Sequence, residues 1–232
     1  ENCNVLDLGC GTGFDVYIVS QLIGEKGKVT GVDMTDKQLE IANKWRDWHR
    51  EKFNYSESNV EFKKGYIEEL DTILIPDSSQ DIVISNCVIN LCQDKRKVLS
   101  EVYRVLKTGG EMYFSDVYSS RRIPEHLKDD KVLLGECLSG ALYWNDFISL
   151  CKDIGFNDVR TVKHNKITIN NSEITEQLRG INFYSVTYRL FKLSMENDCE
   201  DYGQSVIYNG TIENNKEYWE LDNHHRFTSG VE

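Results

Sequence analysis

Three glycines alternate with other residues near the start of the chain, at Gly9, Gly11 and Gly13. They follow the apolar pair Val5-Leu6, which is typical of a buried strand that ends in a turn and opens a helix. Because glycine has no Cβ, such a turn lets the backbone come close to a ligand. Asp33 ends a second apolar run twenty positions after Gly13, where an acid accepts hydrogen bonds from a ribose diol. The pattern predicts a nucleotide-like ligand.

Two details argue against a dinucleotide. The spacing G-x-G-x-G lacks the two-residue gap before the last glycine of the dinucleotide fingerprint. Asp7 also stands two positions before Gly9, where its carboxylate could bind the ammonium end of a zwitterion. This combination resembles motif I of the Rossmann-like S-adenosylmethionine-dependent methyltransferases, which implies that Asp7, the three glycines and Thr12 bind that cofactor. The alternative is a tight strand-to-helix turn without a ligand.

Further candidate residues for the cofactor follow the next strands, since open α/β sheets bind ligands outside the carboxyl ends of their strands. Met34 comes directly after Asp33, and Asn86 ends the fourth expected strand. After the third, Ile67 could cover a purine face while Glu68 or a backbone amide reaches its edge. Asp15 either assists the amino-acid end of the cofactor or is an ordinary acid in the first turn of a helix.

Two of the seven cysteines have positions that suggest chemistry. Cys87 lies just beyond the fourth strand, on the side where a transferred methyl group must emerge, and Cys137 lies in a run of small residues. A free cysteine is most often a small buried hydrophobe. We apply that interpretation to the remaining cysteines, except that Cys199 looks exposed and could be redox-active; they are Cys3, Cys10, Cys92 and Cys151.

The contexts of Cys87 and Cys137 resemble those of the arsenite methyltransferases. The similar stretches are residues 84–91, 110–118, 135–143, 183–185 and 201–204, and the resemblance runs from Asn4 to about Tyr208. It implies that both cysteines are catalytic and hold trivalent arsenic, a soft element that thiolates bind well. The arsenic lone pair would then attack the sulfonium methyl directly, so that positioning and a dry site replace a general base. Arsenite and methylarsenite are the implied substrates, with a thiol reductant, thioredoxin or glutathione, as partner.

The chain departs from this family in one respect. Its members carry further cysteines upstream of motif I, one joining the metalloid site and one implicated in disulfide steps, whereas this chain begins at Glu1 and Cys3 matches neither. We therefore expect a fragment. Glu136 lies either near the metalloid or at an ordinary helix end. Two other functions stay open: methylation of another small molecule, such as a quinone, and metalloid binding without turnover.

Strands and helices alternate through the first two-thirds of the chain, which predicts an α/β fold. The resemblance specifies a Rossmann-like class I methyltransferase with a seven-stranded, mostly parallel sheet flanked by helices, the last strand antiparallel. We expect strands at 5–6, 29–32, 60–62, 82–84, 112–114, 156–159 and 184–190, with a turn at 107–110. Helical faces are predicted from Leu39, Ala42 and Trp45, and from Val98, Val102, Val105 and Leu106. Residues 1–164 would form the methyltransferase core, and residues 165–232 the last strand and a polar tail.

Composition limits the remaining possibilities. The 232 residues are 40% hydrophobic with two prolines, which suits a folded core. A net charge of −11 argues against nucleic acid or an anionic membrane as partner. An odd cysteine count without disulfide-framework spacing favours a reducing compartment. We expect a cytoplasmic monomer with no membrane segment.

Overall fold

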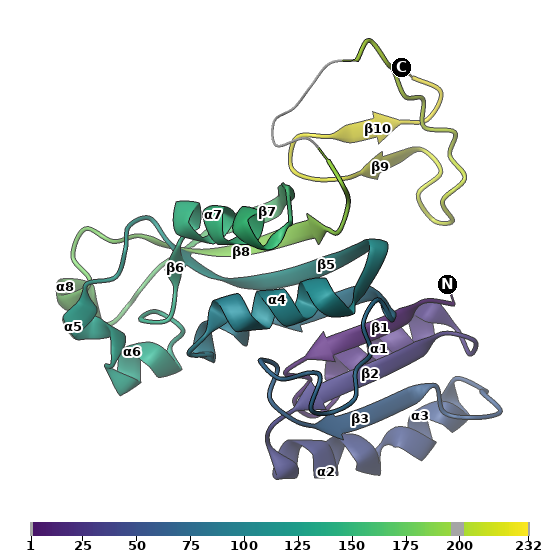
Figure 1. The fold of residues 1–232 in the computed structure, drawn as a ribbon, viewed down its shortest axis with the longest axis horizontal. Helices are drawn as coiled ribbons and strands as arrows, with labels where there is room; N and C mark the ends of the chain where they lie inside the picture. Colours follow the sequence, from purple (N-terminus) through teal and green to yellow (C-terminus); the bar gives the residue numbers. More distant parts are fainter. Residues whose placement is uncertain (1, 196–201, 232) are drawn as a thin grey trace.

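The computed structural model describes residues 2–195 and 202–231 and contains one large sheet with helices on both faces. Strands follow the order β3-β2-β1-β4-β5-β8-β7, with β6 paired to β5 (Figure 1). The strands are β1 (Asn4–Leu8), β2 (Lys28–Asp33), β3 (Val60–Lys64), β4 (Gln80–Asn86), β5 (Leu106–Ser119), β6 (Leu142–Tyr143), β7 (Asp158–Ile167) and β8 (Phe183–Phe191). The helices are α1 (Phe14–Ile23), α2 (Asp36–Lys44), α3 (Arg46–Lys52), η1 (Ile89–Leu91), α4 (Lys95–Val105), α5 (Glu125–Lys128), α6 (Lys131–Gly135), α7 (Trp144–Ile154) and α8 (Ser172–Gln177).

The strand directions confirm the predicted fold class. Strands β1 to β5 pair in parallel, β8 pairs antiparallel with β5, and β7 pairs antiparallel with β8. All seven expected strands are present along this path. The two-residue β6, which pairs in parallel with the end of β5, makes the sheet eight-stranded and was not expected from the sequence.

Both faces of the central strands are buried. Val5, Val29 and Val60 pack on one face with Val16 and Tyr17 of α1 and Leu39 of α2. Leu6, Leu8, Val83 and Met112 pack on the other face with α4 and α7, through residues such as Val98, Val102 and Phe147. A parallel strand that is buried on both faces has an almost continuous apolar sequence, which is why these strands could be predicted.

Three local predictions need correction. Leu39 and Ala42 are buried as expected, but Trp45 is 44% exposed because it lies between α2 and α3, outside both helices. Residues 107–110 form a bulge within β5 instead of a turn before it, and Leu106 belongs to β5 instead of the preceding helix. The backbone of Gly109 and Gly110 bonds to Lys192 instead, which extends the pairing of β5 with the end of β8.

The third correction concerns the sixth strand. Phe156 and Asn157 precede β7, whose first residue is Asp158. Phe156 is fully buried, and its backbone N–H donates to Cys151 O, so it completes the end of α7 at Gly155. Its apolar side chain therefore packs on a helix end, a role that the apolar pattern does not distinguish from the start of a strand.

The C-terminal part adds a small hairpin of β9 (Tyr218–Glu220) and β10 (Arg226–Thr228), seen apart from the main sheet in Figure 1. It is tied to β7 by an ion pair of 2.7 Å between Arg160 and Asp222 and by the bond from Asn223 N–H to Thr161 O. Among described residues, none beyond Leu190 belongs to the buried apolar core. The division at residue 164 stays a prediction, and β7 crosses it. No helix in the described ranges is long and apolar enough to span a membrane.

Candidate functional site

The glycine turn joins β1 to α1, and all three glycines are in the left-handed region, with φ of +71°, +52° and +83° for Gly9, Gly11 and Gly13. Two of them also allow close packing. A Cβ at Gly9 would lie 2.5 Å from Val88 Cγ2, and one at Gly13 would lie 2.7 Å from Phe62 Cζ. A Cβ at Gly11 would meet nothing within 4 Å. Gly11 is therefore the glycine whose backbone is open to a ligand.

Asp33 ends β2 and holds this turn in place. Its Oδ2 accepts a hydrogen bond of 2.9 Å from Gly11 N–H, and its Oδ1 accepts one of 2.8 Å from Thr35 N–H. Each carboxylate oxygen can accept a further bond, so these contacts leave capacity for a ribose diol. The role in supporting Gly11 was missed by sequence reasoning, which assigned Asp33 to the ligand alone.

Asp7 is buried at 4% exposure beneath the glycine turn. Burial, followed by the negative charges of Asp15 and Asp33, raises the pKa of its carboxyl group to about 7. The charged groups that act on Asp7 are thus two further acids. A cluster of three carboxylates beside an open backbone suits a ligand that carries positive charge.

The other predicted cofactor residues differ in exposure. Thr12 and Asn86 are exposed, and Met34 is 60% exposed, all at the carboxyl ends of β1, β2 and β4. Ile67 is only 5% exposed and packs within the apolar core. Glu68 is half-buried, and its negative charge raises the pKa of the Cys92 thiol. Contact of these residues with a cofactor stays a prediction.

Cys87 and Cys137 share an uncommon backbone conformation. Cys87 directly follows β4 with φ of +54°, and its N–H donates to Ser115 O on β5 at 2.9 Å. Cys137 follows α6 with φ of +58°, and its N–H donates to Leu134 O at 2.9 Å. The left-handed region costs a residue with a Cβ about 1–2 kcal/mol. Such strain is found most often at functional sites.

Electrostatics place the two thiols in one environment. Burial raises the pKa of both thiols, and the carboxylate of Asp116 raises both further. The charge of Cys87 also raises the pKa of Cys137. The carboxylate of Asp116 therefore acts on two thiols that are fifty positions apart in the sequence.

Asp116 is the residue at this site that sequence reasoning missed. It lies in β5 at 1% exposure, and its carboxylate accepts hydrogen bonds from Asn90 N–H at 3.0 Å and Val117 N–H at 2.8 Å. Burial raises its pKa to about 6, although these bonds and the charge of Lys95 act in the opposite direction. A signal was present, since a carboxylate within the apolar run of β5 needs specific partners.

Three of the other described cysteines are buried or half-buried, as expected for small hydrophobic residues without a chemical role. Cys10 and Cys151 are buried, and Cys92 is half-buried with a pKa raised to about 12, mainly by burial. Cys87 and Cys137 are free thiols, and Cys199 lies outside the described residues. Within the described ranges, no group of three or more His, Cys, Asp or Glu side chains could hold a metal ion.

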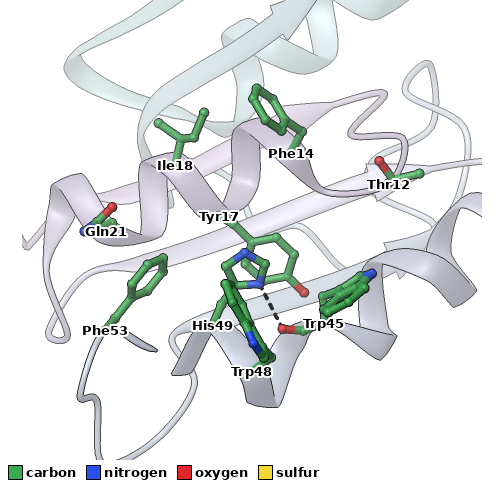
Figure 2. A pocket seen from close by; sticks show the side chains of 9 residues that line it. All are labelled: Thr12, Phe14, Tyr17, Ile18, Gln21, Trp45, Trp48, His49 and Phe53. Carbon is green, nitrogen blue, oxygen red and sulfur yellow. Dashed lines mark hydrogen bonds between the residues drawn. The ribbon is translucent and has the colours of Figure 1, made fainter. Parts of the chain in front are cut away.

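An aromatic pocket of about 420 Å³ lies between α1 and α3 (Figure 2). The rings of Tyr17 and His49 stack in it at 3.7 Å between their centroids, and Trp45 and Trp48 line its side. Thr12 is the one predicted site residue in its lining. The pocket thus begins beside the glycine turn but does not include the two cysteines.

The sheet order, the glycine turn and the acids at the strand ends define a Rossmann-like methyltransferase. A family model described as a methyltransferase domain matches residues 1–178. The crystal structure of an arsenic(III) S-adenosylmethionine methyltransferase from Chlamydomonas reinhardtii superposes with a TM-score of 0.95 at 52% identity, covering 99% of this chain and 77% of that one. The chain belongs to the arsenite methyltransferase family.

Two sequence relatives carry that name. The arsenite methyltransferase of Aquipseudomonas alcaligenes is 52% identical over 99% of this chain, and that of Homo sapiens is 50% identical over 99%. The chain spans only 66% and 61% of the lengths of these two relatives.

Proposed function

We propose that the chain transfers a methyl group from S-adenosylmethionine to trivalent arsenic, first as arsenite and then as methylarsenite, held by Cys87 and Cys137. The observation that carries this proposal is the pair of left-handed cysteines around Asp116, at the edge of the sheet where the glycine turn lies. The names of the relatives support the same substrate.

The glycine turn and its acids fit the cofactor. Gly11 offers an open backbone, Asp33 retains acceptor capacity for a ribose, and Asp7 with Asp15 provides negative charge for an ammonium group. When bound, S-adenosylmethionine supplies a methyl group on a positively charged sulfur. The contact of Gly9 with Val88 joins this turn to the segment that begins at Cys87, so the two binding sites adjoin.

Cys87 and Cys137 act as ligands to the substrate. Each thiol replaces one hydroxide of arsenous acid: a sulfur–arsenic bond forms, an arsenic–oxygen bond breaks, and the thiol proton leaves with the hydroxide as water. The raised pKa values of the two thiols suit this exchange, because it consumes their protons and leaves no net charge on sulfur. Arsenic held in this way keeps its lone pair, which is the nucleophile toward the methyl group.

Methylation uses that lone pair and leaves arsenic formally pentavalent, so a second methylation needs two electrons. We propose that a thiol reductant, thioredoxin or glutathione, supplies them by forming a disulfide. A cytoplasmic location would keep the site cysteines reduced, and Cys87 and Cys137 are free thiols in the structure. That the chain acts as a monomer, without nucleic acid or membrane, stays a prediction.

The test is to titrate trivalent arsenic into the chain and into Cys87→Ser and Cys137→Ser, with Cys92→Ser as the matched control. We expect both site variants to bind much more weakly and the control to bind like the parent. Undiminished binding in both site variants would refute the two-thiol site. Methyl transfer is then assayed with S-adenosylmethionine and a thiol reductant. Binding without transfer would identify a metalloid-binding protein, and transfer only to a quinone would identify another methyltransferase.

A further inference from the structure

The two site cysteines lie on different segments that meet at one point. Cys87 begins a segment that continues through η1, and Cys137 lies four residues before Ala141 on the segment that follows α6. Gly140 of the second segment touches Asn90 of the first. A Cβ at Gly140 would lie 2.1 Å from Asn90 O and 3.0 Å from Asn90 C, both of which are backbone atoms. No side chain can therefore move aside to admit a larger residue.

Asn90 is fixed from three directions. Its N–H donates to Asp116 Oδ2 at 3.0 Å, and its Nδ2 donates to Val117 O at 2.6 Å. Lys95 Nζ donates to Asn90 O at 3.3 Å, which is the same carbonyl that Gly140 approaches. Asn90 is only 3% exposed, so these bonds are shielded from water. The first segment is thus anchored to β5 at the contact.

The second segment is equally constrained. The N–H groups of Leu138 and Ser139 both donate to Leu133 O, at 2.8 and 3.1 Å, and the N–H of Ala141 donates to Leu138 O at 3.2 Å. Leu138 and Ser139 are each 5% exposed. This turn includes Cys137, so a shift of Gly140 away from Asn90 would carry the Cys137 thiol with it.

We propose that Gly140 is a positioning residue: its contact with the Asn90 carbonyl sets the separation of the Cys87 and Cys137 sulfurs, so that both bind one arsenic atom. The inference rests on the proposed function, since it matters only if the two thiols share a ligand. It adds a residue that touches neither arsenic nor cofactor. The test is Gly140→Ala, because the added methyl must push the two segments apart.

Gly135 provides a matched control. It lies two residues before Cys137, at the end of α6, and a Cβ there would meet nothing within 4 Å. Gly135→Ala therefore adds the same methyl group to the same region without a clash. Binding is measured with phenylarsine oxide, which forms two sulfur–arsenic bonds to a thiol pair and releases water. Reaction of each thiol with iodoacetamide is measured by mass spectrometry as the one-thiol reference.

We expect Gly140→Ala to weaken phenylarsine oxide binding by at least about tenfold, since the second bond of a chelate depends on geometry. Alkylation of Cys87 and Cys137 by iodoacetamide should stay within about twofold of the parent, and Gly135→Ala should behave like the parent in both assays. Unchanged phenylarsine oxide binding in Gly140→Ala would overturn the positioning role. Loss of binding and alkylation together would show a general structural defect and also overturn it.

Two further measurements separate the possible failures. If the parent chain itself does not bind phenylarsine oxide through both thiols, the proposed function fails, and the positioning role of Gly140 is overturned with it. If Gly140→Ala does not fold, Asn90→Ala replaces it, because it removes the 2.6 Å bond to Val117 O and loosens the same contact without a clash. A selective loss of chelation in Asn90→Ala supports the proposal, and parent-like chelation contradicts it.

Discussion

Replacing Asp7 by Asn should make the ligand-free chain more stable and its cofactor binding weaker. Asp7 has a pKa raised from 3.8 to about 7 by burial and by Asp15 and Asp33, so its ionised form is disfavoured in the folded chain. An acid whose pKa is higher in the folded than in the unfolded chain makes its full contribution to the free energy of unfolding only at low pH. That contribution is lost as the pH rises from the unfolded pKa, about 4, to the folded pKa, about 7. Asn has the same shape without the charge, so the variant avoids the loss.

The size of the effect follows from the two pKa values. Each pKa unit corresponds to about 1.4 kcal/mol, so the raised pKa of Asp7 lowers the free energy of unfolding by about 3 kcal/mol at pH 6 and about 4 kcal/mol at pH 8, relative to low pH. These figures are upper bounds, because the variant must still place an amide among polar groups. The increase between pH 6 and pH 8, about 1.4 kcal/mol, depends less on that placement.

Urea unfolding of the parent chain and Asp7→Asn at pH 6 and pH 8 measures this difference, with Asp36→Asn, at an exposed acid, as the control. S-adenosylhomocysteine binding is measured by calorimetry at the same pH values. If the ionised carboxylate binds the ammonium group of the ligand, parental affinity should fall about tenfold from pH 8 to pH 6. Asp7→Asn should bind weakly and without that pH dependence. A stability difference that does not grow with pH, or parental affinity that is flat between pH 6 and pH 8, would refute the reasoning.

Three further outcomes are expected. Cys87→Gly should be more stable than Cys87→Ser by about 1 kcal/mol in urea unfolding, because glycine tolerates the φ of +54°; equal stability would argue against backbone strain there. Asp33→Ala should weaken S-adenosylhomocysteine binding by about 1–3 kcal/mol in calorimetry, whereas Asp36→Ala, which removes an exposed ion pair with Lys64, should not. Asp222→Ala should expose the β9–β10 hairpin to limited proteolysis while leaving the methyltransferase core intact, and a parental cleavage pattern would contradict the tie to Arg160.

The sequence predicted the sheet well because its strands are buried on both sides. Apolar runs such as those of β1 and β4 have few alternatives once glycine turns and helices separate them. Errors occurred where an apolar or turn-forming residue had a different tertiary partner. Phe156 packs on the end of α7, and the glycines at 109 and 110 bond to Lys192, a residue more than eighty positions away. Local patterns carry no information about such partners.

For the candidate site, too, the sequence revealed some residues but not the contacts that support them. Residue type and strand-end position were enough to select Gly11, Asp33 and Cys87 as candidates, whereas Cys137 was selected by its resemblance to the arsenite methyltransferases. The supporting contacts were not accessible, because they join distant segments: Asp33 holds Gly11, and Asp116 holds Asn90. Gly140 is the clearest case, since a glycine in a run of small residues gives no indication that its Cα faces a backbone carbonyl.

The raised pKa values of the Cys87 and Cys137 thiols suit side chains that bind a ligand better than side chains that attack a substrate as nucleophiles. A cysteine that attacks a substrate needs a lowered pKa, which nearby cations or a helix N-terminus provide. Here burial and the carboxylate of Asp116 raise the pKa of both thiols, which favours their protonated form over the thiolate. The same features favour trivalent arsenic, because two neutral sulfur–arsenic bonds replace two thiols without placing negative charge beside Asp116. On the proposed function, such a site selects its substrate by charge as well as by its sulfur atoms, because it disfavours thiolates and accepts a neutral, thiophilic ligand.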